Sequence, residues 1–121
     1  MRRLLPCLPI LCALLGVACA ARAQSAPEPI RLAMIEGFSG PFANAGQSWL
    51  RNLRFAAEAV NQRGGVRLVD AAGRVVHRPL VIETFDGKGQ VEDSLVALRA
   101  AQDRGIGFVA QGASSAVAGA F

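Results

Sequence analysis

The sequence predicts an α/β fold in which a parallel sheet is packed between two layers of helices. Short apolar runs, with the length of buried strands, alternate with longer segments in which apolar residues recur at helical spacing. The connections between them are short and rich in glycine, and the resulting order is strand–helix–strand–helix–strand. This order is typical of parallel β-α-β units, because parallel neighbours need a crossover helix between them.

The first strand and the first helix follow from the beginning of this pattern. Residues 30–35 form a short apolar run, and residues 37–46 contain three glycines, which is typical of a loop. A helix is predicted from Gln47 to Arg63, because apolar residues recur along one stripe and Gly64-Gly65 can take the left-handed conformation that ends a helix. The pattern predicts that Trp49 belongs to the core rather than to a ligand site. The stripe consists of Trp49, Leu53, Ala56, Ala57 and Val60.

A hairpin and a second strand are predicted next. Residues 66–76 resemble a small hairpin, with His77 at its margin facing solvent, and residues 79–84 read as a strand. Asp86 ends this strand, where a ribose-binding acid lies in dinucleotide-binding folds. Its separation of 40 residues from Gly46 exceeds the roughly 20 of that pattern, so a turn or capping role is favoured.

The remaining elements complete a three-layer, Rossmann-like parallel sheet. A second helix is predicted over 91–104, with Val91, Leu95, Leu98 and Ala101 in line and Gly105 as its stop. A third strand follows over 106–110. The segment 112–115 then leads into a third helix. A parallel sheet of three strands leaves its edges bare, so residues 24–121 are expected to be one incomplete α/β lobe.

Residues 1–23 have the features of a secretory signal peptide. Two arginines follow the initiating methionine, an apolar run extends from Leu8 to Ala18, and cleavage is predicted between Ala23 and Gln24. The run is shorter than the roughly 20 apolar residues that a membrane-spanning helix needs. The alternative is a lipoprotein signal in which Cys19 carries the lipid.

Charge and composition argue against a nucleic-acid partner. The 121 residues carry a formal charge of +4, and only seven of them are aromatic. Three of the 13 basic residues precede residue 24, whereas all nine acidic residues follow it, so residues 24–121 carry only +1. A nearly neutral segment with few aromatic rings offers nucleic acid neither electrostatic attraction for its phosphates nor a surface on which its bases can stack.

No cofactor or metal is predicted. Gly37, Gly40 and Gly46 do not fit the G-x-G-x-x-G fingerprint, and no Gly-Lys-Ser/Thr follows them as in a P-loop. All three cysteines precede residue 24 and His77 is the sole histidine, so residues 24–121 lack a cysteine or histidine set for a metal.

The predicted topology favours a ligand site between the first and third strands. In a doubly wound sheet, ligands bind at the carboxyl ends of the strands, where the connections diverge to opposite faces. If the second and third strands flank the first, the loops 37–46 and 111–115 border that crevice.

Ser114 and Ser115 are the candidate binding residues, because they lie where a strand becomes a helix. Free N–H groups at such a start, together with the two hydroxyls, suit a carboxylate or a phosphate. One alternative is that a serine only caps the helix. Another is a nucleophile, since Gly112-Ala113-Ser114-Ser115-Ala116 approaches the G-x-S-x-G elbow, although its last position is Ala and an acid and a histidine would have to follow residue 121.

Several of these segments together resemble the type 1 periplasmic binding proteins of ABC transporters, in the branched-chain amino-acid group (leucine-binding protein domain). The Ser39-Gly40-Pro41 loop and the helix end Val60–Val66 are fairly specific in combination, because their spacing also matches. The resemblance covers almost all of residues 24–121 and the first quarter to third of such a protein, which implies a truncated N-terminal lobe. The matching segments are Ile30–Ile35, Phe38–Pro41, Ala45–Gln47, Ala56–Val66, Phe85–Asp86 and Gln111–Ser115.

The resemblance implies a two-lobed periplasmic receptor without enzymatic activity, which captures a small solute and delivers it to a membrane ABC permease. In relatives the serine loop holds the ligand's α-carboxylate, and this role carries over to Ser114 and Ser115, with Gly112 and Ala113 beside them. Relatives often place an aromatic residue where this sequence has Ala45 in the loop that lines the cleft. This departure leaves other amino acids, amides, urea and aromatic acids open as ligands.

Three alternatives remain at the level of sequence. The first is a secreted serine hydrolase built on Ser114. The second is a ligand-sensing module of the same fold, coupled to a receptor rather than a permease. The third is a truncated remnant without function.

Overall fold

The computed structural model describes residues 27–121. The predicted signal peptide, its cleavage position between Ala23 and Gln24, and Cys19 lie outside the described residues. The elements are β1 (Ile30–Glu36), the short 3-10 helix η1 (Gly40–Phe42), α1 (Ala43–Gln62), β2 (Val66–Val69), β3 (Val75–Arg78), β4 (Leu80–Asp86), α2 (Val91–Asp103), β5 (Phe108–Ala110) and α3 (Ser115–Ala120).

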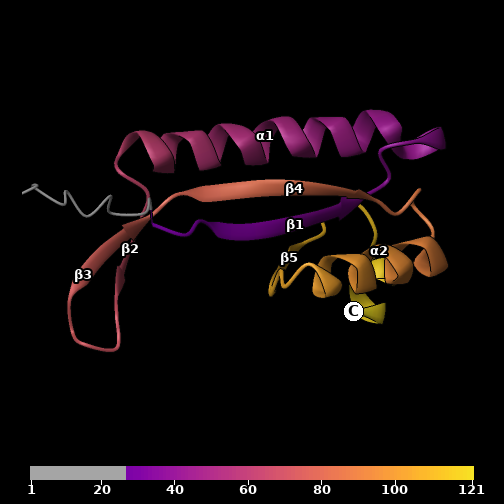
Figure 1. Cartoon of the computed structure of the whole chain (residues 1–121). Coiled ribbons are helices and arrows are strands. Elements are labelled where there is room, and N and C mark those ends of the chain that lie inside the picture. The colour runs from indigo at the N-terminus through magenta and orange to yellow at the C-terminus, as the bar shows by residue number, and fades with distance from the viewer. Residues whose placement is uncertain (1–26) are drawn as a thin grey trace, which may run out of the picture.

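The central sheet has the order β4-β1-β5, and both pairings are parallel. Helix α1 covers one face of the sheet and α2 lies on the other (Figure 1). Because β4 and β5 lie on opposite sides of β1, the two crossovers diverge at the carboxyl end of β1. This confirms the predicted α/β architecture and the position of its switch point.

Strand register brings the loops of the predicted site to one edge. Glu36, the last residue of β1, pairs with Asp86, the last residue of β4, and Met34 pairs with Ala110 at the end of β5. Residues 33–36 are buried because β1 has a strand on each side and a helix on each face. The loops after β1, β4 and β5 therefore start from the same edge of the sheet.

The core between the sheet and α2 is built largely from small side chains. Of the predicted apolar line on α2, only Ala101 is fully buried, and Ser94 and Ala97 take the other buried positions. Small residues let the helix axis approach the sheet closely, which the larger Leu95 and Leu98 would prevent from the same positions. The core cluster consists of Ala33, Ile35, Phe85, Ala97, Ala101 and Ile106.

Helix α1 begins at Ala43, four residues earlier than predicted. The glycines of residues 37–46 indicated a loop, but Gly46 lies inside the helix and is buried. A Cβ on Gly46 would lie only 2.3 Å from the carbonyl oxygen of Gly37. The glycine is therefore required for close approach between the first turns of α1 and the segment after β1, rather than for a flexible loop.

The predicted core position of Trp49 is wrong, since this residue is 50% exposed. The buried line on α1 runs through Gly46, Leu50 and Ala57, while Leu53 and Val60 are half-buried at its border. The predicted stripe therefore overlaps the buried line at Ala57 but lies to one side of it on the helix surface. The indole lies instead against Gly112, where an added Cβ would be 3.1 Å from Trp49 Cε2.

The predicted hairpin is confirmed as the antiparallel pair β2-β3. Gly64 and Gly65 follow α1 with φ of +97° and +95°, which confirms the left-handed helix end. In the turn, Asp70 accepts hydrogen bonds from the N–H of Ala72 and Arg74, at 2.9 Å each. His77 is exposed on β3, as predicted.

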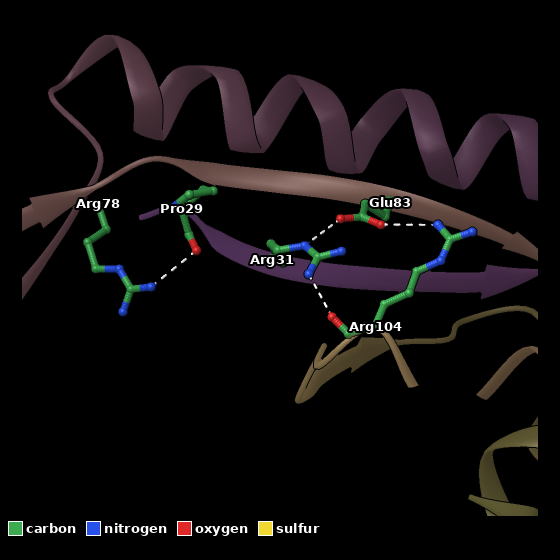
Figure 2. A network of polar contacts seen from close by, with 5 residues as sticks. All are labelled: Pro29, Arg31, Arg78, Glu83 and Arg104. Carbon is green, nitrogen blue, oxygen red and sulfur yellow. Dashed lines mark hydrogen bonds and ion pairs between the residues drawn. The ribbon is translucent and has the colours of Figure 1, made fainter. Parts of the chain in front are cut away.

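An arginine network links the amino-terminal half of β1, the middle of β4 and the end of α2 (Figure 2). Arg31 donates from Nε to Glu83 at 2.6 Å and from Nη1 to the carbonyl of Arg104 at 2.7 Å, and Arg104 lies 3.5 Å from the other Glu83 oxygen. The hydrogen bond from Arg31 lowers the pKa of Glu83 below its ordinary value. Arg78 donates to the carbonyl of Pro29 at 3.2 Å. The network explains why a charged residue interrupts the first apolar strand.

Candidate functional site

A small pocket lies at the predicted switch point, between the carboxyl ends of β1 and β5. Its volume is about 80 Å³. The residues that line it come from β1 and its following segment, from α2 and its preceding turn, and from the serine loop with α3. They include Glu36, Phe42, Ser94, Gln111, Ala113 and Ser114.

Ser114 caps α3 and also lines this pocket. Its Oγ accepts a hydrogen bond from the N–H of Val117 at 3.4 Å, so the capping alternative describes part of its role. No hydrogen bond among residues 27–121 uses the N–H groups of Ser114 or Ser115. Ser115 is exposed and does not line the pocket. The start of α3 thus combines a capped helix end with backbone donors that the protein itself leaves free.

Gly112 and Ala113 have a different role, because their N–H groups are already bonded. Both donate to the Oε1 atom of Glu36, at 2.5 Å from Gly112 and 3.0 Å from Ala113. These two donors are therefore occupied within the protein. A role for Gly112 and Ala113 in holding the ligand stays a prediction, and in this structure their N–H groups fix the serine loop to Glu36.

Glu36 is the residue of this site that sequence reasoning missed. It is 3% exposed, at the end of the central strand, and it bonds across to the loop after β5. A buried carboxyl group is costly unless it is hydrogen-bonded, and the two N–H groups supply that compensation. The available signal was an acidic residue directly ending an apolar strand, just before a glycine.

A second pocket, of about 110 Å³, lies on the α1 side of the same strand ends. Trp49 and Leu53 of α1 form one wall, and Gly112 lies opposite. Glu36 and Gln111 line both pockets. Glu36 is the only charged residue among those lining either pocket.

Ala45 lies away from the serine loop. It is exposed on the first turn of α1 and lines a shallow groove with Ser48, Trp49 and Asn52. Trp49 also belongs to the second pocket, so the groove borders the site. The structure therefore brings Gly112, Ala113 and Ser114 together, but not Ala45.

Asp86 joins the loops that follow β1 and β4, in line with the predicted turn role. Its Oδ1 accepts hydrogen bonds from the N–H groups of Phe38 and Lys88, at 2.9 Å each. Burial alone would raise the pKa of Asp86, but hydrogen bonds from the Ser39 hydroxyl and from three backbone N–H groups lower it overall. The Lys88 ammonium pairs with Asp93, at 3.1 Å, rather than with Asp86.

The hydrolase alternative finds no histidine near Ser114 within the described residues. His77 lies on the β2-β3 hairpin, which leads into the amino end of β4, whereas Ser114 follows the carboxyl end of β5 (Figure 1).

Residues 27–121 contain no group of three or more metal-ligating side chains. Within the same residues, no helix has both the length and the apolar character needed to cross a membrane.

Comparison with known proteins places the chain in a family. A profile described as "Periplasmic binding protein" matches residues 29–121. The Leu/Ile/Val-binding protein homolog 4 of Brucella abortus is 30% identical over 109 residues, which cover 86% of this chain and 24% of the relative. The homologues of Brucella suis and Brucella melitensis match to the same extent. No solved structure gave a significant match.

The chain spans about a quarter of the length of these curated relatives. The profile match covers nearly every described residue, including β1, the loop that follows it and the serine loop. The parallel sheet with its switch point at β1 agrees with a partial lobe of this kind. The chain belongs to the periplasmic binding protein family.

Proposed function

We propose that this chain forms part of the first lobe of a solute receptor that delivers its ligand to an ABC permease. The ligand would be an amino acid or a related small carboxylate, held between this lobe and a second one. The family match and the name of the Leu/Ile/Val-binding relatives support this class of ligand. Binding and release would follow lobe movement rather than a chemical step.

The observation that carries the proposal is the pocket at the switch point, with its free backbone donors. The N–H groups of Ser114 and Ser115 and the Ser115 hydroxyl are available to a carboxylate at the start of α3. Gly112 and Ala113 would contribute by holding the loop in place through Glu36. Relatives often have an aromatic residue where this chain has Ala45, so the proposal does not commit to leucine as the ligand.

The proposal includes export. Residues 1–23 would act as a cleaved signal peptide, with processing between Ala23 and Gln24, and residues 24–121 would fold in the periplasm. Mass spectrometry of the exported chain tests this directly, because cleavage there predicts an N-terminus at Gln24. A lipid-modified N-terminus at Cys19 would favour the lipoprotein alternative instead.

The binding site is tested by calorimetry on the two-lobed protein that this proposal implies. Leucine, valine, glutamine, urea and benzoate serve as probes. Replacing both Ser114 and Ser115 by alanine is expected to weaken binding of the preferred probe about 10-fold or more, the effect of losing hydrogen bonds to a charged group. Thr84→Ala removes an exposed hydroxyl that lines neither pocket, and it serves as the control.

Unchanged affinity in the double variant would remove the two serine hydroxyls from the site. Binding of none of the probes would contradict the proposed ligand class.

A further inference from the structure

Glu36 has a second carboxylate oxygen whose role the proposed carboxylate site does not explain. Oε1 accepts both loop hydrogen bonds, and no hydrogen bond or ion pair among residues 27–121 uses Oε2. Within the same residues, no buried side-chain nitrogen or oxygen lacks a partner. Since Oε2 has no partner, it is not fully inaccessible to solvent, and Glu36 lines both pockets.

The surroundings of Oε2 contain no compensating cation. Neither pocket is lined by an arginine, lysine or histidine, and their other polar side chains, Ser94, Gln111 and Ser114, are neutral. The arginine network is centred on Glu83 in the middle of β4, and neither Arg31 nor Arg104 lines either pocket (Figure 2). A ligand group beside Glu36 therefore meets an unneutralised negative charge in a largely apolar enclosure, where charge interactions are strong.

This electrostatic setting favours one kind of ligand group. A second carboxylate at Oε2 would be repelled, and it would find the nearest donors, the Gly112 and Ala113 N–H groups, already bonded to Oε1. A nitrogen that carries hydrogen would instead donate a charge-assisted hydrogen bond, which is about twice as strong as a neutral one.

We propose that Glu36 is a specificity-determining residue that accepts a hydrogen bond from a protonated or amide nitrogen of the ligand. This inference rests on the proposed function and restricts the class of ligands that the receptor would bind. The substrates would carry a nitrogen donor next to the carboxylate held at the serine loop, as amino acids do. Plain carboxylic acids, including aromatic acids, are excluded as good ligands.

One residue would then serve both ends of the ligand. Oε1 positions the serine loop through Gly112 and Ala113, while Oε2 accepts a hydrogen bond from the ligand nitrogen. The structure predicts that Glu36→Gln separates the two roles. The amide oxygen can still accept the two loop N–H groups, but the NH₂ that replaces Oε2 is a donor and has no negative charge.

The experiment uses the ¹⁵N-labelled chain, purified after export, in a backbone amide NMR titration that detects millimolar binding. Leucine, 4-methylpentanoate and 3-methylbutylamine are the probes, because the second lacks the amine and the third lacks the carboxylate. The wild-type chain is expected to bind leucine about 10-fold or more tightly than 4-methylpentanoate, with the largest shifts at 112–115.

In Glu36→Gln the leucine to 4-methylpentanoate affinity ratio is expected to fall about 10-fold, toward one. A loss of loop positioning alone would weaken both probes equally and leave the ratio unchanged. Glu58→Gln removes the same charge from the exposed face of α1 and should keep the wild-type ratio.

The possible failures are distinct. A wild-type chain that binds leucine no better than 4-methylpentanoate overturns the role of Glu36, whether or not the variant folds, and leaves the carboxylate site standing. An unchanged ratio in Glu36→Gln also overturns it. The absence of shifts at 112–115 with every probe overturns both the role of Glu36 and the proposed carboxylate site on this lobe.

Discussion

Replacing Gly46 by alanine tests how closely α1 must approach the segment after β1. The new Cβ would lie 2.3 Å from the carbonyl oxygen and 3.0 Å from the carbonyl carbon of Gly37, and both atoms belong to the backbone. Neither can rotate away as the end of a side chain could. The first turns of α1 must therefore shift from the strand end that carries Glu36.

The magnitude follows from two opposing effects. Forcing extra volume into a packed interior costs about 1–3 kcal/mol, and a backbone contact this short belongs at the upper end. Alanine in place of glycine inside a helix stabilises the folded state by up to about 1 kcal/mol, because of its higher helix propensity. We therefore expect Gly46→Ala to lower the free energy of unfolding by about 1–2 kcal/mol, which for a domain of this size lowers Tm by roughly 4–16 °C.

Urea denaturation followed by circular dichroism measures this change. Gly119→Ala in α3 is the matched control, because a Cβ there meets no heavy atom within 4 Å and only the helix-propensity gain should remain. If Gly46→Ala is as stable as the wild-type chain, or more stable, the argument that this glycine is required for close packing is refuted.

Further predictions concern the core, the loops and the indole. Ile35→Ala removes a side chain with no exposed surface and should cost about 2–5 kcal/mol in urea denaturation; a cost below 1 kcal/mol would contradict its placement in the core. The lowered pKa of Asp86 means that its contribution to stability is present above the unfolded-state pKa and is lost as pH falls through the folded-state pKa. Asp86→Asn should therefore flatten the acid side of the stability–pH profile, and an unchanged profile would show that its hydrogen bonds do not favour the ionised form. Gly112→Ala would place a Cβ 3.1 Å from Trp49, the only tryptophan, so the indole should move outward and its fluorescence should shift to the red. An emission spectrum identical to the wild type would argue against this contact.

Trp49 shows why periodicity located α1 without identifying its buried line. Apolar residues extend over a wide arc of the helix, so the pattern alone cannot tell which line faces the sheet. In the structure, Leu50 and Ala57 face inward, and Trp49 reaches sideways to Gly112. That position depends on where β5 and its loop lie relative to α1, which is a long-range property.

Glu36 shows the same limit at the site. The sequence placed an acid at the end of an apolar strand, but the atoms that satisfy it are the N–H groups of Gly112 and Ala113, 76 and 77 residues away. No local spacing rule connects positions so distant. The strand order decides which loop meets Glu36, because β5 rather than β4 lies on that side of β1.

The sequence by itself determined the α/β class, the alternation of elements, the helix end at Gly64-Gly65 and the serine loop, because each depends on local backbone preferences and hydrophobic periodicity. Only the tertiary structure decided that Gly46 is a packing contact, that Trp49 borders the site, and that Glu36 bonds to the serine loop. These features arise where segments distant in the chain meet, and their energies depend on distances between atoms that no local pattern encodes.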